Sequence, residues 1–246
     1  MQRTSVLSIV GLLGLVGTTL AATTLAATST VAVSSADSRA WQDYLVPLPK
    51  QIEIDRKLFG QAQRRLQAHA NIDLRCGDFL RSSLPKHTPY KVFANIPFSI
   101  TTQIIRKLTE TCHPPTDMWL VRDKGAAKCC LGEPRETQRS LLLKPNWNLR
   151  IVYHFRKEDF HPHPSVDSVL VHFSRKQQPD IQPEQWKQYE RFVHHGLQYG
   201  FWGGKSLLSK KQVSRALQSA GYPPEYQDGL LLYVQWLCLF RCWQRK

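Results

Sequence analysis

The chain has 246 residues, which is long enough for one well-packed domain and a smaller second one. It contains 33 Lys and Arg against 19 Asp and Glu, a formal net charge of +14, and apart from Arg3 all of these residues lie from Asp37 onward. A basic excess of this size favours a polyanionic partner such as nucleic acid, with solubility alone as the alternative explanation.

The first 45 residues differ in composition from the rest. Val6–Ala27 is apolar and small, in the manner of a signal peptide or a weak membrane anchor, but it is rich in Thr, Ala and Gly rather than Leu. We expect no stable membrane association. Gly11, Gly14 and Gly17 show no strand-to-helix context and the wrong spacing for a nucleotide-binding fingerprint, so we interpret them as loose composition.

Residues 46–176 have the pattern of an α/β domain. Alternating strands and helices at this spacing predict a parallel sheet with helices on both faces, and two later strands joined by a proline-rich loop suit an antiparallel pair at its edge. The strands are expected at Lys50–Ile54, Ile72–Arg75, Tyr90–Ala94, Met118–Val121, Leu149–Phe155 and Ser168–Phe173.

Residues 177–246 are predicted to form a small, basic, all-helical domain after a polar linker. Helices are expected near Glu184–Tyr199, Ser209–Ala220 and Glu225–Trp243. The second of them carries Lys210 and Lys211 on its polar side, where they suit contact with phosphates.

The six cysteines form no Cys-x-x-Cys pair and no cluster with histidines at metal-ligand spacing, so we expect no metal site. Reduced and mostly buried thiols are expected instead, which favours an intracellular, cytoplasmic protein. The cysteines are Cys76, Cys112, Cys129, Cys130, Cys238 and Cys242.

Polar side chains follow three of the predicted strands, where ligands of open parallel sheets bind. Glu53 follows the first strand, Asp78 the second and Asn95 the third. A carboxylate at such a place suits the hydroxyl groups of a ribose, and a second one suits an adenine amino group. Taken singly, an acidic residue at a strand end is more often a helix cap, but the three together in this order favour a nucleotide site.

The turn Asn95-Ile96-Pro97-Phe98 is predicted to hold a planar base that carries an exocyclic amine. The Asn95 side-chain oxygen and a backbone carbonyl fixed by Pro97 would accept both hydrogens of the amine, and Phe98 would stack on the ring. Such a site transfers a methyl group by positioning alone, without a strong base. The alternative is an ordinary Asn-Pro turn.

The motifs together resemble a known family from about Gln51 to the end of the chain. IEID, GDFL, KVFANIPFSITTQIIRKL, the RSL at Arg139–Leu141 and FHPHPSVDS are similar to the rRNA adenine N6-methyltransferases of the erythromycin-resistance (Erm) type. FANIPF followed by ITTQIIRKL is specific for the wider rRNA adenine dimethyltransferase group, which includes housekeeping enzymes acting on small-subunit rRNA. The length and the short helical C-terminal domain look more like the resistance branch.

The resemblance implies a Rossmann-like class I methyltransferase sheet that uses S-adenosyl-L-methionine, with a small C-terminal all-helical domain that helps to hold RNA. It implies that Glu53 binds the cofactor ribose, Asp78 the cofactor adenine, and Asn95 to Phe98 the target adenine, Asn95 also lying against the cofactor. The expected partner is 23S rRNA, the expected state a monomer, and the expected outcome macrolide, lincosamide and streptogramin B resistance. Residues expected to contact RNA are Lys128, Arg139, His161, Lys210 and Lys211.

The region expected to hold the cofactor's glycine-rich turn differs from the pattern of the family. Counting back from Glu53 to the family's glycine-rich E-x-G-x-G-x-G turn lands on Thr30–Ala36, where Ala and Ser stand in place of glycines. Cβ atoms there would crowd the approach of the backbone to the cofactor. Two explanations stay open: a diverged or inactive N-terminal half, or a start region that is mis-framed or fused. A non-catalytic RNA-binding relative and a secreted protein are the competing functions.

Overall fold

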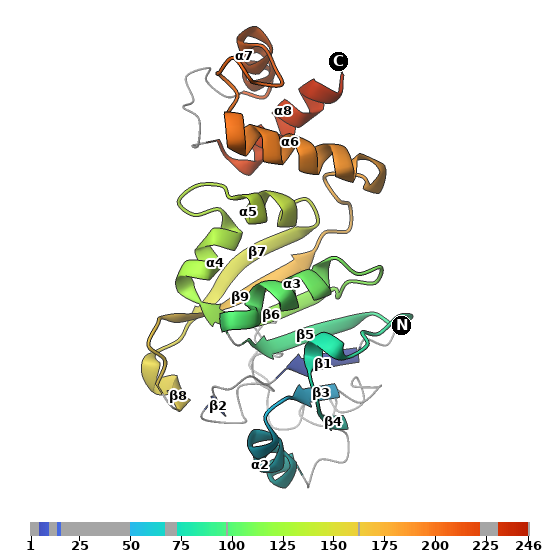
Figure 1. Cartoon of the computed structure of the whole chain (residues 1–246), viewed down its shortest axis with the longest axis vertical. Helices are drawn as coiled ribbons and strands as arrows, with labels where there is room; N and C mark the ends of the chain where they lie inside the picture. Colours follow the sequence, from blue (N-terminus) through green and yellow to red (C-terminus); the bar gives the residue numbers. More distant parts are fainter. Residues whose placement is uncertain are drawn as a thin grey trace, which may run out of the picture. The chain divides into compact units, whose positions relative to one another are not determined.

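The computed structural model describes residues 5–9, 14–15, 50–66, 73–96, 98–161, 163–221 and 231–245 (Figure 1). The chain divides into two compact units. The first unit comprises Met1–Lys124 and Arg150–Ser174, and the second comprises Gly125–Leu149 and Arg175–Lys246. The predicted domains, residues 46–176 and 177–246, stay predictions.

A seven-stranded sheet in the order β4-β3-β1-β5-β6-β9-β7 organises the first unit. Neighbours from β4 to β6 are parallel, and β9 runs antiparallel to β6. This order confirms the predicted Rossmann-like class, with the antiparallel strands at one edge. The strands are β1 Ser5–Ile9, β3 Lys50–Glu53, β4 Asp73–Cys76, β5 Tyr90–Asn95, β6 Asp117–Asp123, β7 Trp147–His154 and β9 Ser168–Arg175.

The apolar composition of the central strands explains their place. Val92 and Ala94 of β5 and Met118 and Leu120 of β6 are fully buried, as expected for parallel strands covered on both faces. A separate two-stranded ribbon pairs β2 (Gly14–Leu15) with β8 (Phe160–His161) in antiparallel fashion.

Ser5–Ile9 corrects the interpretation of the N-terminal segment. These residues form β1, which lies between β3 and β5 and is parallel to both. A strand that ends two residues before Gly11 was not predicted. The interpretation of Gly11, Gly14 and Gly17 as loose composition stays a prediction. Thr30–Ala36 lies outside the described residues, and for the rest of residues 1–45 the signal-like and mis-framed interpretations stay predictions.

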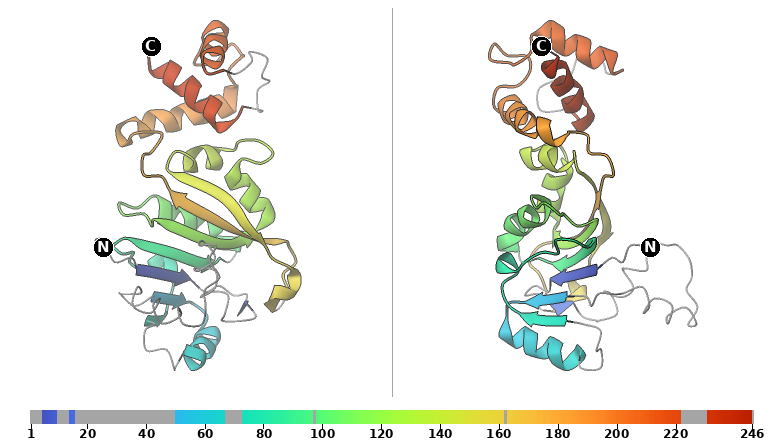
Figure 2. Two further views of the ribbon diagram at one scale, coloured as in Figure 1. Left: turned by 180° about the vertical axis from the view of Figure 1, so that it is seen from behind. Right: turned by 90° about the vertical axis from the view of Figure 1, so that its right-hand side faces the viewer.

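Two helices of the first unit each connect a pair of neighbouring parallel strands (Figure 2). They are α2, Arg56–Leu66, and α3, Thr101–Thr109. In α3, Ile104, Ile105 and Leu108 are buried and lie on one face of the helix. Helices on both faces of the sheet stay a prediction.

The second unit is helical and has an aromatic core. Its helices are α4 Lys124–Leu131, α5 Gln138–Leu143, α6 Trp186–Tyr199, α7 Lys210–Ser219 and α8 Tyr233–Gln244. Phe192 on α6 lies with its ring centroid 5.5 Å from that of Phe240 and 6.3 Å from that of Trp236 on α8, both in edge-on geometry. The three helices predicted beyond the linker are confirmed, with the third beginning at Tyr233.

Glu136 explains why residues 125–149 belong with the C-terminal helices. Its carboxylate accepts a hydrogen bond from Ser140 Oγ at 2.6 Å and from the Tyr233 backbone N–H at 3.2 Å, and it pairs with Lys144. Tyr189 donates its hydroxyl to the Leu141 carbonyl at 3.0 Å. These bonds join α5 to α6 and α8.

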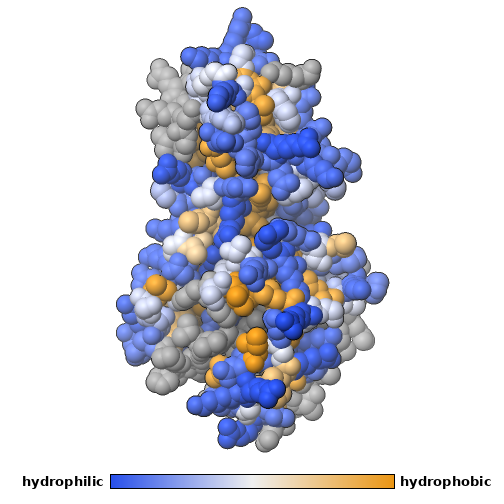
Figure 3. All heavy atoms as spheres, in the orientation of Figure 1, coloured by the Kyte–Doolittle hydropathy of each residue, from blue (hydrophilic) through white to orange (hydrophobic). Residues whose placement is uncertain are grey.

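The cysteines and the surface bear on the remaining expectations. All six cysteines are free, and reduced thiols stay a prediction. The expectation that most are buried is wrong, because Cys76, Cys112 and Cys129 are exposed. The face drawn in Figure 3 is mainly hydrophilic, with apolar residues in small groups. In the described ranges, no helix is long and apolar enough to cross a membrane.

Candidate active site

The strand register brings the predicted polar residues to one edge of the sheet. Ile9 of β1 is paired with Ile52 of β3 on one side and with Ala94 of β5 on the other. Ile52, Ile9 and Ala94 thus form one row across the three strands, and Glu53 and Asn95 are the next residues after Ile52 and Ala94. Their backbones are two strand spacings apart, or roughly 10 Å. Asp78 follows β4, whose last residue Cys76 pairs with Glu53. The predicted row of polar strand ends is present in the fold.

Glu53 is the most deeply buried acidic group at this edge, with 1% of its surface exposed. One carboxylate oxygen accepts the Asp55 backbone N–H at 2.9 Å, and the other is buried with no hydrogen-bond partner among the described residues. Burial raises the pKa of this carboxyl, and the backbone N–H groups of Asp55 and Ile54 act in the opposite direction. A buried carboxylate oxygen with spare acceptor capacity fits the hydroxyl groups of a ribose.

Asp78 is both a helix cap and a potential ligand. One oxygen accepts the Leu80 backbone N–H at 2.8 Å and so begins the 3₁₀ turn Phe79–Arg81. The other oxygen lies 3.7 Å from Nε of the exposed Arg81, too far for a hydrogen bond. The helix-cap alternative is correct for Asp78, and its second oxygen retains acceptor capacity.

Lys107 holds this turn in place and was not predicted. Its ammonium on α3 donates to the carbonyls of Phe79, Leu80 and Ser82 at 2.8, 2.7 and 2.5 Å. Burial lowers the pKa of Lys107, and the charge of Asp78 raises it. In the sequence, Lys107 lies between Ile104 and Leu108, which are buried in α3. A lysine at such a position can equally well point into solvent, so the sequence does not distinguish the two roles.

The acceptor turn is partly described. Asn95 is buried with 6% exposed, and Ile96 is 2% exposed and donates its backbone N–H to the Val121 carbonyl at 3.2 Å. This bond fixes the exit of β5 against β6. Pro97 lies outside the described residues. Phe98 opens a 3₁₀ turn, Phe98–Ile100, and its side chain is likewise outside what is described.

The residues predicted to contact RNA fall in both units. Lys128 on α4 and Lys210 and Lys211 on α7 are exposed, and Arg139 on α5 is half-buried, all in the second unit. His161 belongs to the first unit, where its backbone pairs with Gly14. In the parts of the chain that are described, no three His, Cys, Asp or Glu side chains are placed to hold a metal ion.

Residues 50–199 match the family model of ribosomal RNA adenine dimethylase. The chain belongs to this family. It is 32% identical over 195 residues to the rRNA adenine N-6-methyltransferase of Lysinibacillus sphaericus, covering 78% of this chain and 75% of that protein. With the enzyme of the same name from Escherichia coli it shares 30% identity over 169 residues, covering 69% and 66%.

Two solved structures share the fold of this family member. The crystal structure of the 23S rRNA methyltransferase ErmE superposes with a TM-score of 0.75 at 21% identity, covering 99% of this chain and 93% of that chain. A dimethyladenosine transferase from Plasmodium falciparum gives a TM-score of 0.65 at 16% identity, covering 97% and 90%. These likenesses confirm a Rossmann-like methyltransferase fold with a C-terminal helical region.

As a member of this family, the chain is an enzyme of the rRNA adenine N6-methyltransferase type, and its cofactor is S-adenosylmethionine. The spare oxygen of Glu53 and the second oxygen of Asp78 fit the acceptors that its ribose and adenine need. When bound, the cofactor supplies an electrophilic methyl group on sulfur. The protein then has to position an amine nitrogen opposite that methyl group and exclude water.

Proposed function

We propose that this enzyme methylates N6 of an adenine in 23S rRNA and thereby confers resistance to macrolides, lincosamides and streptogramin B. The single observation that carries the proposal is the placement of Glu53 and Asn95 on the two strands that flank β1, each following the same row. Glu53 is acidic and has a buried oxygen with no hydrogen-bond partner among the described residues, and Asn95 is a buried amide. Two different ligands, a ribose and a base amine, suit these two groups.

The residues divide the work between donor and acceptor. Glu53 accepts the ribose hydroxyls and Asp78 the amino group of the cofactor adenine, while Lys107 keeps the Asp78 turn in position. The Asn95 side-chain oxygen and the backbone carbonyl of Ile96 accept the two amine hydrogens of the target adenine. The nitrogen lone pair is then directed away from both acceptors, and Phe98 stacks on the base.

The large-subunit target is supported by the resemblance of the motifs and of the short helical C-terminal region to the resistance branch. The shared fold with ErmE agrees with this choice. Lys128, Arg139, Lys210 and Lys211, with His161, supply contacts to the RNA backbone in this proposal. The enzyme works as a monomer in the cytoplasm, where ribosomal RNA is found.

The experiment offers the purified full chain equal amounts of protein-free 23S and 16S rRNA with methyl-labelled S-adenosylmethionine. We expect label in 23S rRNA, none in 16S rRNA, and loss of transfer in Asn95→Ala. Asn148→Ala is the matched control, because Asn148 is exposed on β7. Label in 16S rRNA would identify a housekeeping small-subunit enzyme instead, and wild-type transfer by Asn95→Ala would refute the acceptor assignment.

A further inference from the structure

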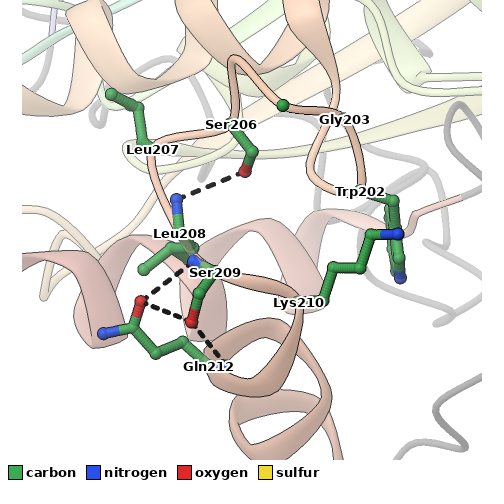
Figure 4. Close-up of a pocket in the computed structure, with 9 residues that line it drawn as sticks. Trp202, Gly203, Ser206, Leu207, Leu208, Ser209, Lys210 and Gln212 are labelled. Atoms are coloured by element: carbon green, nitrogen blue, oxygen red, sulfur yellow. Dashed lines mark hydrogen bonds between the residues drawn. The ribbon is translucent and has the colours of Figure 1, made fainter.

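The connection between α6 and α7 borders a hollow that has no part in the methyl-transfer site described above. Its volume is about 540 Å³, within the range of small-molecule sites. Trp202, Gly203 and Gly204 line one part of it and Leu207, Leu208 and Lys210 another. In the close-up, the Lys210 side chain extends toward Trp202 (Figure 4). All of these residues belong to the second unit.

The wall around Trp202 is open enough for a flat ring. Trp202 is half-buried and packs against the aromatic core of the second unit, so one part of the indole is supported while another remains accessible. A Cβ atom added at Gly204 would meet nothing within 4 Å, and at Gly203 its nearest neighbour would be the Tyr199 carbonyl at 3.4 Å. The two glycines beside Trp202 in the sequence are therefore not closely packed on their side-chain side.

The stretch of sequence that carries the hollow has only basic charged side chains. From residue 191 to residue 220 the sequence contains no Asp or Glu. The basic side chains of this stretch are all exposed, and they are Arg191, Lys205, Lys210, Lys211 and Arg215. A basic stretch of this kind attracts a polyanion, and exposed lysines suit phosphate oxygens.

The loop that carries these groups is held by several contacts. A ring nitrogen of His195 lies 2.7 Å from the Lys205 carbonyl, and the Lys205 ammonium lies 5.3 Å from the centre of the Tyr199 ring. Ser206 Oγ accepts the Leu208 backbone N–H at 3.2 Å. Because the hollow is shaped before any ligand arrives, binding loses less loop entropy.

We propose that this hollow binds one unpaired nucleotide of the rRNA substrate, with the base stacked on Trp202 and the adjoining phosphate paired with Lys210. The proposal rests on the proposed RNA substrate and adds a base-binding subsite to it. An aromatic face beside lysines is the arrangement that holds single-stranded nucleic acid, because every base has a face that stacks. A duplex keeps its bases stacked on one another and gains only the phosphate contacts.

The test measures binding of the full chain to an unstructured single-stranded RNA and to a duplex of the same length, by fluorescence anisotropy at several salt concentrations. For Trp202→Leu we expect single-strand affinity to fall by about 5- to 150-fold, with duplex affinity within about twofold of wild type. Trp202→Phe keeps a ring and should recover part of the loss. Lys210→Gln should reduce the salt slope for single strands by about 0.7.

Lys187→Gln is the matched control, since Lys187 is exposed on α6, outside the lining of the hollow, and lies between Glu184 and Glu190 in the sequence. It should bind both RNAs like wild type. Three results would overturn the subsite. The first is that Trp202→Leu loses equal affinity for the single strand and the duplex. The others are single-strand binding that is unchanged in both Trp202→Leu and Trp202→Phe, and a wild-type chain that does not bind single strands. A failure of the proposed function is seen separately, as the absence of methyl transfer to 23S rRNA by the wild-type enzyme.

Discussion

Replacing Glu53 by Gln separates the cofactor role of this side chain from its effect on folding. The substitution keeps an oxygen for the Asp55 N–H and removes the charge from the buried oxygen that has no partner among the described residues. Hydrogen bonds to a charged group contribute about 1.5–3 kcal/mol, so affinity for S-adenosylmethionine should fall by about 10- to 150-fold. Isothermal titration calorimetry of the purified chain measures this loss.

The same variant makes a prediction about stability and pH. Burial raises the folded-state pKa of Glu53 above its ordinary value of 4.5, so the folded state binds the proton more tightly than the unfolded state does. This contribution to stability is complete below pH 4.5 and is lost as the pH rises through the folded-state pKa. Relative to wild type, Glu53→Gln should therefore gain free energy of unfolding as the pH rises from 4 to about 7.

Glu110→Gln is the control for both measurements. Glu110 is exposed at the end of α3 and forms a surface pair with Arg106, so its loss should change stability by less than about 0.5 kcal/mol and leave cofactor affinity unchanged. Cofactor binding by Glu53→Gln within twofold of wild type would refute the role assigned to this carboxylate. A loss of stability at neutral pH larger than that at pH 4 would refute the account of its burial.

Three further substitutions test the packing that supports the sites, each by urea unfolding. Lys107→Met removes the donor to three carbonyls and should lower the free energy of unfolding by about 2 kcal/mol. Arg106 is exposed, so Arg106→Met should lower it by less than about 0.5 kcal/mol. Equal losses would contradict the positioning role of Lys107. Asp117→Asn should cost about 1–2 kcal/mol of unfolding free energy at pH 7, because a hydrogen bond from His172 lowers the pKa of Asp117 below its ordinary value of 3.8. This contribution to stability is present above pH 3.8 and is lost as the pH falls through the folded-state pKa. A cost that stays the same in acid would contradict this explanation. Gly196→Ala places a Cβ 2.7 Å from the Trp236 ring and should lower the free energy of unfolding by about 1–3 kcal/mol. Gly60→Ala places its Cβ where nothing lies within 4 Å and should raise the free energy of unfolding by about 0.5–1 kcal/mol. A stabilising Gly196→Ala with a destabilising Gly60→Ala would argue against this packing.

The central strands and the polar residues after them were predictable because two local signals coincide there. β5 and β6 are short apolar runs, and a polar residue follows at the point where the chain leaves the sheet. Since parallel strands end at the same edge, the sequence also predicts that Glu53, Asp78 and Asn95 gather there. The pairing of Ile9 with both Ile52 and Ala94 supplies the common row that the sequence did not contain.

β1 and Lys107 were missed for the opposite reason, because their local sequence fits another structure equally well. Ser5–Ile9 lies in an apolar segment that resembles a signal peptide, and only its pairing with β3 and β5 distinguishes a central strand from a leader. Lys107 has the sequence of a solvated helix position, and its three acceptors lie more than twenty residues earlier in the chain. Long-range partners decide both cases.

The central claim is that the edge formed by β3, β1 and β5 methylates N6 of adenine in 23S rRNA. The most direct measurement digests 23S rRNA treated with the wild-type chain or with Asn95→Ala and identifies methylated adenosines by mass spectrometry. The account predicts N6-methylated adenosine at one position in the wild-type sample and none with Asn95→Ala. A folded wild-type enzyme that binds S-adenosylmethionine and the RNA but leaves N6 of every adenine unmodified would contradict it.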